Sequence, residues 1–325
     1  MTKQLLTTSL LGATLAVAAG AAQAEEVTLN AVSFTPKSAV VSHGFEAFVA
    51  AINEEFEGEL QINWRGGPEV MPPFRLADAV RNGSIDMALT SPSYYSGLVP
   101  SATASNLSFK TYAEIAETDY LSRMTEVHAE RGLHFLGEIP ASPVKFFLFF
   151  KDEVTGLDDI AGKRIRVFPT ILPFVASLGA EPLVLPMGEI YTAMERGVID
   201  GFAQSNLGWV DQFEDVVNYY ITPSYYRAGF NVLVNPEAWS ELPEDLQGRV
   251  QAYLRDELAP EIDASWDEII ADGYRQMDEA GFQEVELTGD AADQYIATAI
   301  EAAWDKLAED VDPALHADLK AMLVD

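Results

Sequence analysis

The residues best suited to chemistry lie in a short basic segment of an otherwise acidic chain. Residues 162–167 read Gly-Lys-Arg-Ile-Arg-Val, so Arg166 stands between Ile165 and Val167 in an expected strand. A guanidinium inside an apolar strand needs a partner, because an unpaired buried charge is costly. A ligand carboxylate held by both arms of the guanidinium would satisfy it. An acidic side chain of the protein could do the same, and the residue pattern leaves both interpretations open.

No other residue pattern indicates catalysis, a metal site or a cofactor. The chain has no Cys, and its four His residues are scattered without the spacing of a zinc site. It contains no nucleophile elbow, no phosphate-binding Gly-rich lysine loop and no dinucleotide fingerprint. Adjacent acidic residues such as Glu54 and Glu55 are common in this chain and are interpreted as solvated surface groups. We therefore predict no catalytic residue, no metal and no cofactor.

The net charge limits the partners that the protein can have. The 325 residues include 51 acidic and 20 basic side chains, which gives a formal net charge of −31. Nucleic-acid binding requires a basic surface, so we expect no nucleic-acid partner. The same acidic field repels small anions. A site for an anionic ligand must therefore be locally basic, and the few cations within apolar segments are its best candidates.

The N-terminal residues have the pattern of a secretory signal peptide. Lys3 precedes an apolar run over 5–22, and the small residues Ala22 and Ala24 flank Gln23 at an expected cleavage site. A membrane anchor is the alternative interpretation, but Thr and Ser residues interrupt the apolar run. We predict that residues 1–24 are a cleavable signal peptide and that the mature protein is periplasmic.

Two strand–helix–strand–helix–strand runs predict the fold class. The first run covers residues 27–89 and the second covers 163–202. This order favours parallel sheets covered by helices, which is an α/β fold. Between the two runs, 134–139 and 146–150 have the pattern of two strands, and the second is apolar enough to cross between domains.

The C-terminal third is predicted to be helical. Apolar residues recur every three to four positions from 246 to 277, which is typical of a long helix that contacts more than one unit. Pro260 lies inside this run and is expected to kink the helix or mark a junction. A last helix is expected over 295–307.

Loops that follow the expected strands carry candidate pocket residues. Ligands of open α/β sheets bind at the carboxyl ends of parallel strands. Phe34 follows the first expected strand, and Ser91 and Tyr94 follow the third. Aromatic walls with a few polar groups are typical of small-molecule pockets, although each aromatic residue taken alone is more often part of a core. The loop at 66–69 would place Glu69 at the cleft, or would simply form a turn.

Five motifs in combination resemble those of the solute-binding proteins of TRAP transporters (tripartite ATP-independent periplasmic transporters), dicarboxylate type. The resemblance runs through essentially the whole chain after residue 24. It implies a two-lobed periplasmic binding protein of type II-like α/β fold, with a long helix spanning both lobes. Lobe I would contain 25–143 and about 230–260, and lobe II would contain 144–229 and about 261–325. The motifs are Asn-Gly-Ser-Ile-Asp-Met at 82–87, the basic segment 162–167, Leu-Gly-Ala-Glu-Pro at 178–182, the segment 189–201 ending in Val-Ile-Asp-Gly, and Leu-Pro-Glu-Asp-Leu-Gln at 242–247.

The same resemblance implies a set of ligand-binding residues. Arg166 matches the family's carboxylate-binding arginine, and Lys145 matches a second basic position on the preceding strand. Where the family usually has Gln-Glu-Asn-Pro, this chain has Phe-Ala-Gln-Ser at 202–205. This departure argues against sialic acid, ectoine and simple dicarboxylates as ligands. The further positions implied are Gln204, Asn206, Met187, Phe34, Ser91 and Trp209.

The function predicted from the sequence is capture of a small organic acid, a monocarboxylate in our interpretation. The protein would deliver this anion to the membrane permease subunits of a TRAP transporter. Two alternatives stay open. A sensory module of a membrane receptor would bind its ligand in the same way, and a secreted hydrolase or lyase would act on an acidic metabolite, although no catalytic motif supports it.

Overall fold

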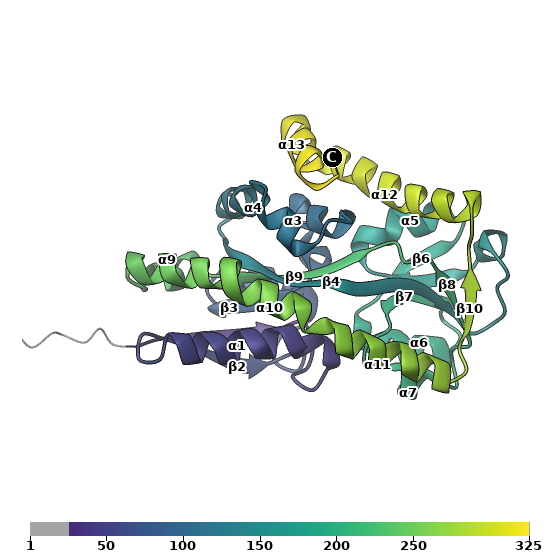
Figure 1. Cartoon of the computed structure of the whole chain (residues 1–325), viewed down its shortest axis with the longest axis horizontal. Coiled ribbons are helices and arrows are strands. Elements are labelled where there is room, and N and C mark those ends of the chain that lie inside the picture. Colours follow the sequence, from purple (N-terminus) through teal and green to yellow (C-terminus); the bar gives the residue numbers. More distant parts are fainter. Residues whose placement is uncertain (1–25, 325) are drawn as a thin grey trace, which may run out of the picture.

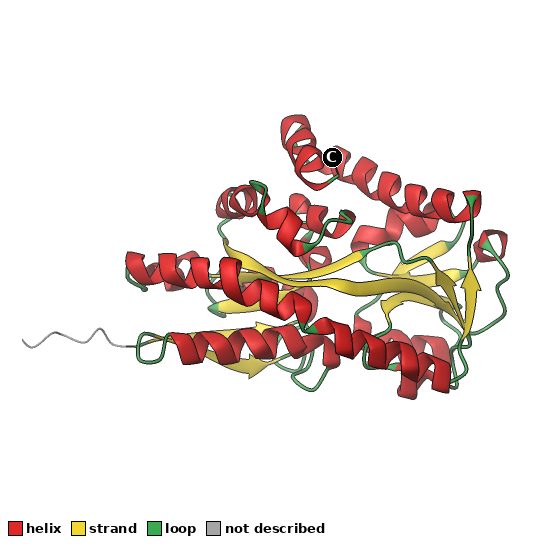
Figure 2. Cartoon of the chain, viewed as in Figure 1, coloured by secondary structure: helices red, strands yellow, loops and turns green. Residues whose placement is uncertain are grey.

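The computed structural model describes residues 26–324, so the predicted signal peptide lies outside the described residues. Helices cover both sides of a central sheet of ten strands within the described part of the chain (Figure 2). The main strand order is β2-β1-β3-β9-β4-β7-β5-β6, with β8 and β10 joined to it through β4. The expected α/β architecture is therefore present, as one continuous sheet rather than two separate ones.

The first expected βαβαβ run is observed. Strand β1 pairs in parallel with both β2 and β3, as the strand–helix–strand order predicts. Helix α1 buries Phe45, Phe48 and Ile52, whose spacing of three to four residues forms its apolar face. The elements are β1 (Val27–Ser33), α1 (His43–Glu55), β2 (Leu60–Gly66), α2 (Leu76–Arg81) and β3 (Met87–Thr90).

The second expected βαβαβ run has the same arrangement. Strand β5 pairs in parallel with β6 and β7, so the carboxyl ends of these strands lie at one edge. Arg166 lies in the middle strand of the three, opposite Leu183 on one side and Phe202 on the other. The elements are β5 (Arg164–Val167), α5 (Leu172–Ser177), β6 (Glu181–Val184), α6 (Ile190–Glu195) and β7 (Gly201–Ser205).

The two strands predicted over 134–139 and 146–150 are in fact one strand, β4 (His134–Phe150). The prolines and serine between them suggested a break. The chain instead stays extended: Pro140 remains in register with Gly229, and Ser142 and Pro143 are absorbed in an irregularity between Ala141 and Lys145. Ser142 there donates its backbone N–H to Asp263 Oδ1 at 2.7 Å rather than to the sheet. Strand β4 pairs with β9 (Arg227–Val234) along its first part and with β7 and β8 (Tyr219–Thr222) along its second part.

The predicted long helix is a run of consecutive helices that crosses the molecule from the β2–β3 side to the β7–β8 side (Figure 1). A π-helical turn over Leu254–Leu258 precedes Pro260, which lies in the first turn of the following helix. Proline cannot donate a backbone hydrogen bond, which accounts for a change of hydrogen-bonding pattern at this point. The junction expected at Pro260 is thus confirmed. The run comprises α9 (Glu244–Tyr253), α10 (Ala259–Ala264) and α11 (Trp266–Glu279).

The remaining helices cover the sheet. The helix expected over 295–307 is α12 (Asp290–Asp310), and α13, which the sequence did not predict, follows it. Among residues 26–324, no helix combines the length and apolar character needed to cross a membrane. The other elements are α3 (Tyr112–Ala116), α4 (Tyr120–Ala129), α7 (Val210–Phe213), α8 (Pro236–Ser240), β10 (Gln283–Glu286) and α13 (Pro313–Leu323).

Three apolar clusters form the interior. The largest lies around β1, β3 and the first part of β4, and the other two lie on opposite faces of the second part of β4. Leu148 and Phe150 belong to one of these smaller clusters and Phe147 and Phe149 to the other, as strand alternation requires.

Candidate ligand-binding site

A cavity lies where the carboxyl ends of the two parallel strand sets meet. Phe34 follows β1 and Ser91 follows β3, while Phe168 follows β5 and Leu207 follows β7, and all four line the cavity. It encloses about 580 Å³ of space free of atoms, part of it open to solvent. This position is that of small-molecule sites in open α/β sheets.

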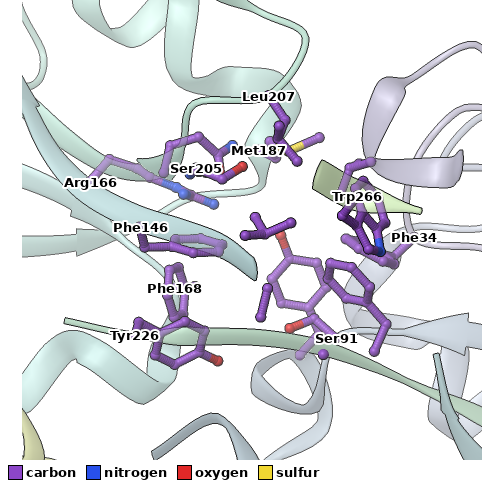
Figure 3. A pocket seen from close by; sticks show the side chains of 17 residues that line it. Phe34, Ser91, Phe146, Arg166, Phe168, Met187, Ser205, Leu207, Tyr226 and Trp266 are labelled. Atoms are coloured by element: carbon purple, nitrogen blue, oxygen red, sulfur yellow. Dashed lines mark hydrogen bonds between the residues drawn. The ribbon is translucent and has the colours of Figure 1, made fainter. Parts of the chain in front are cut away.

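Arg166 reaches this cavity from β5 and is 1% exposed. Its Nε donates to the carbonyl of Leu185 and its Nη1 to the carbonyl of Ala203, both at 2.9 Å. These carbonyls lie on the two flanking segments, so they fix the plane of the guanidinium, and Figure 3 shows it pointing into the cavity. No carboxylate among residues 26–324 forms an ion pair with Arg166.

The electrostatics of Arg166 follow from this arrangement. Burial lowers the pKa of the guanidinium, and the hydroxyls of Tyr94 and Tyr225 oppose this by favouring the charged form. An arginine stays protonated in proteins even so. Arg166 is therefore a buried positive charge whose neighbours are neutral dipoles, which is the environment that a ligand anion would complete.

Aromatic rings form most of the remaining wall, in two groups. Phe34 packs against Tyr94 and Phe230, with ring centroids 5.7 and 5.0 Å apart. A second set, made of Phe146, Phe168 and Tyr226, has centroids between 4.9 and 5.4 Å apart. Tyr94 and Phe146 each pack against two of the three apolar clusters, so the cavity lies at the junction between those clusters.

The cavity has few polar groups besides Arg166. Gln204 accepts a 3.2 Å hydrogen bond from the Ser205 backbone N–H through Oε1, which leaves its Nε2 group free to donate. Ser91, Ser205 and Tyr94, each of which carries a hydroxyl, also line the space. Trp266, from α11, donates its indole N–H to the Pro140 carbonyl at 3.0 Å and so offers the cavity only an apolar surface.

Six of the ten residues predicted for the site line this cavity. Whether they bind a ligand stays a prediction. They come from segments far apart in the sequence, and the alignment of the strand ends brings them together. The six are Phe34, Ser91, Tyr94, Arg166, Met187 and Gln204.

Lys145 and Glu69 lie elsewhere. Val144 and Phe146 face the cavity, so strand alternation turns Lys145 to the opposite side of β4, where it lines a separate hollow. Glu69 accepts a 2.8 Å hydrogen bond from the Gly67 backbone N–H and closes its own loop. This hydrogen bond lowers the pKa of the Glu69 carboxyl. The turn interpretation of this loop therefore fits the structure.

Asn206 and Trp209 also lie outside the cavity. Asn206 is packed beneath α11, since a Cβ atom on Gly273 would lie 2.4 Å from the Asn206 carbonyl oxygen. The Trp209 ring packs edge-to-face against Phe149 and Phe202, and its indole N–H donates to the Ser205 carbonyl. Both residues therefore support the end of β7 from behind.

Several lining residues were not predicted. Phe146 on β4, and Tyr226 and Phe230 at β9, sit at every second position of their strands. Their period-two alternation could have identified them once the two strands were recognised as neighbours. Trp266 lies far along the chain within an amphipathic helix, and its position gave no local signal.

The fold and the cavity together define a class: an α/β protein with a small-molecule-type cavity at the carboxyl ends of its parallel strands. Comparison with known proteins agrees. A family model described as bacterial extracellular solute-binding protein, family 7, matches residues 31–310, and the chain belongs to this family. The resemblance seen in the sequence motifs is thereby confirmed.

Similar proteins and structures add detail. A monocarboxylate 2-oxoacid-binding periplasmic protein of Nostoc is 28% identical over 229 residues, which are 65% of this chain and 61% of that relative. A TRAP periplasmic solute-binding protein of Desulfovibrio salexigens with bound orotic acid has a TM-score of 0.80 at 18% identity, covering 91% of this chain and 97% of that one.

A marine metagenome TRAP solute-binding protein in complex with pyroglutamate has a TM-score of 0.79 at 18% identity, covering 92% of this chain and 99% of that one. These structural matches confirm the predicted two-lobed α/β fold.

Proposed function

We propose that the protein captures a monocarboxylate with an apolar or aromatic body and delivers it to the permease of a TRAP transporter. Membership of an extracellular solute-binding family supports the role in capture. The observation that carries the ligand class is Arg166, a buried guanidinium without an ion-pair partner among residues 26–324, at the wall of a largely aromatic cavity.

The number of charges at the cavity favours one carboxylate over two. Arg166 is the one charged side chain among the described residues that line it. A second carboxylate would face aromatic rings without a cation. It would lose its hydrating water without gaining an ion pair or hydrogen bonds in return, which is energetically costly. A monocarboxylate satisfies both parts of the site, because its charge meets Arg166 and its body covers Phe34, Phe168 and Phe230.

A 2-oxo group beside the carboxylate would find a donor in Gln204. The free Nε2 of this residue suits a keto or hydroxyl oxygen, whereas Lys145, the second basic residue implied by the family resemblance, lines a separate hollow. The Nostoc relative is named for monocarboxylate 2-oxoacids, which supports the same class. We therefore propose preference for 2-oxo and aromatic monocarboxylates.

Calorimetric titration with matched pairs tests the ligand class. Phenylpyruvate, 2-oxoisovalerate and benzoate would be compared with succinate and malate, after a thermal-shift screen of organic acids, since a ligand of the folded state raises Tm. We expect tighter binding of at least one monocarboxylate. Tighter binding of succinate or malate than of every monocarboxylate tried would overturn the assignment.

Transport, rather than sensing or catalysis, is tested with the same ligand. We expect it to be recovered unchanged after prolonged incubation with the protein. Vesicles that contain the permease subunits should take it up only when the protein is added. Turnover of the ligand would instead support an enzyme. Capture of a membrane receptor, without uptake, would support a sensory module.

We also propose that residues 1–24 direct export to the periplasm and that the two lobes close on the ligand. Lobe I would contain 25–143 and about 230–260, and lobe II would contain 144–229 and about 261–325, so the crossings lie within β4, within β9 and in α10. Solution scattering should show a smaller radius of gyration with saturating ligand. An unchanged radius with ligand demonstrably bound would contradict closure.

A further inference from the structure

A second hollow lies on the opposite side of β4 and β9 from the ligand cavity. It encloses about 570 Å³ of space free of atoms, part of it open to solvent. Tyr226 lines both spaces, so they are separated by little more than the two strands. We call it the hinge hollow, defined by Phe109, Lys110, Thr111, Ser142, Pro143, Lys145, Ser224, Tyr226, Arg227 and Asp263.

The charge of the hinge hollow is opposite to that of the protein. Lys110, Lys145 and Arg227 line it with a single carboxylate, Asp263, in a chain of net charge −31. Lys145 is half-buried, and its Nζ donates to the Ser142 carbonyl at 3.3 Å. Lys110 donates to the Met322 carbonyl at 3.0 Å. Neither ammonium forms an ion pair within residues 26–324.

The surroundings of Lys145, Asp263 and Ser142 determine which charges and donors of the hollow are free to meet an anion. Burial lowers the pKa of Lys145, and the nearby charge of Arg227 lowers it further, while Asp263 opposes both. The carboxylate of Asp263 is engaged, since its Oδ1 accepts the Ser142 backbone N–H. The Ser142 hydroxyl accepts a 3.1 Å hydrogen bond from the Tyr112 backbone N–H, so its own proton is free to donate.

Arg227 is a further source of donors. It is 3% exposed, and its Nη2 lies 2.8 Å from Glu138 Oε1. This ion pair compensates its charge, yet none of its nitrogens makes a well-directed hydrogen bond to a side chain or carbonyl of the described residues. A buried N–H group without an acceptor is costly, so an acceptor at this position would be stabilising.

We propose that the hinge hollow binds a small oxyanion between Lys145 and Arg227. Ammonium, guanidinium and hydroxyl donors suit the oxygens of a sulfate-like ion or of a small carboxylate. Lining residues come from both sides of the proposed lobe boundary at 143 and 229. The bound oxyanion therefore holds together the strands that join the lobes. This inference does not depend on the ligand assigned to the cavity at Arg166.

Thermal unfolding with sodium sulfate, at ionic strength held constant with sodium chloride, tests the proposal. We expect a saturable rise in Tm for the unmodified protein without organic ligand. In Lys145→Met the sulfate midpoint should rise at least tenfold. Lys151→Met is the matched control, because it removes the same charge from an exposed position outside the hollow. Arg166→Gln separates this site from the ligand cavity, and its response should persist.

A parallel titration with sodium acetate distinguishes the two sources of oxyanion. A saturable rise in Tm with sulfate, with acetate or with both supports the site if this rise is lost in Lys145→Met. The salt that gives the saturable rise identifies the kind of oxyanion bound. Lys145→Gln provides a second variant if the methionine protein does not fold. An equal saturable response in Lys145→Met and Lys151→Met overturns the proposal. So does a rise in Tm that never saturates in any variant, because that is a general salt effect.

Discussion

Arg166 and Arg227 are both buried arginines on strands of one sheet, and their surroundings differ in a single respect. Arg166 meets backbone carbonyls and aromatic rings, whereas Arg227 meets the carboxylate of Glu138, which is itself 1% exposed. Arg227 and Glu138 are therefore neutral as a pair, whereas Arg166 keeps an uncompensated positive charge. The comparison teaches that the partner supplied by neighbouring strands, rather than the residue type, determines which arginine keeps an uncompensated charge.

The largest effect should come from removing the partner of Glu138. Arg227→Met leaves a buried carboxylate uncompensated, and we expect the free energy of unfolding to fall by about 3–5 kcal/mol. Urea unfolding measures it. The double variant Arg227→Met with Glu138→Leu should recover most of the loss, because no charge then remains. A loss below about 1 kcal/mol in the single variant would show that Arg227 and Glu138 are not coupled in this way.

At Arg166 the same kind of change should act on binding. Arg166→Ala removes no internal ion pair among the described residues, so we expect ligand affinity to weaken by roughly 2–5 kcal/mol, without the loss of stability expected for Arg227→Met. Arg166→Lys should restore only part, because a point charge replaces a fork. Calorimetry with the best ligand from the screen measures both variants.

Arg164→Ala is the matched control for Arg166, since Arg164 lies on the same strand but pairs with Asp200 outside the cavity. Its affinity should equal that of the unmodified protein. Equal affinities in Arg164→Ala and Arg166→Ala would remove the distinction between the two positions.

Hydrogen bonds link Asn231, which lies opposite Glu138 on β9, through Tyr95 to the buried His128. This histidine should make the stability of the region depend on pH. His128 is buried, contacts the Tyr95 hydroxyl at 2.9 Å, and Tyr95 in turn accepts from Asn231. Burial lowers the pKa of His128 to about 4. The unfolded chain takes up this proton from about pH 6.5 downward, so stability is full above that pH and declines toward pH 4, by about 3 kcal/mol for this residue.

Urea unfolding at pH 7 and pH 4.5 measures this decline, and comparison with His128→Gln isolates it from the many carboxylates of the chain. The glutamine variant should lose less stability between the two pH values. Burial also lowers the pKa of His134 to about 4, so His134→Gln should behave in the same direction. An identical pH dependence in all three proteins would contradict the assignment.

The smallest effect is expected at Asp200, because this carboxylate and its partner Arg164 are both partly exposed to solvent. Arg164 donates to both oxygens of Asp200, at 3.0 and 2.6 Å, and these hydrogen bonds lower the pKa of the Asp200 carboxyl. The pair therefore contributes above the usual Asp pKa and is lost as the pH falls through the lowered value. Asp200→Asn should cost little stability, since exposed pairs contribute little, and should leave ligand affinity unchanged.

More of the fold than of the candidate site could be predicted from the sequence. Both βαβαβ runs follow from local periodicity, and the cavity then follows from where parallel strands end. The prolines at 140 and 143 concealed the continuity of β4, because proline in a strand usually marks a break. Lys145 was assigned by its resemblance to a family position, although the alternation of Val144 and Phe146 turns it away from the cavity.

Other site residues had no signal in the sequence. Trp266 reaches the cavity only because the helical run from α9 to α11 crosses the molecule, which is a tertiary event. The distinction between Arg166 and Arg227 likewise depends on which strand lies beside each one. The position of Glu138 opposite Asn231 on β9 could not be read from residue spacing.

The continuity of β4 has a consequence for how the molecule unfolds. One strand supplies side chains to all three apolar clusters, and it pairs with β9 along its first part and with β7 and β8 along its second part. Neither half can lose its core without exposing strand edges and apolar residues of the other. Cooperativity should therefore extend over both halves, and calorimetric melting should show a single transition whose van't Hoff and calorimetric enthalpies agree. Fragments that divide the chain within β4 should not fold as independent units.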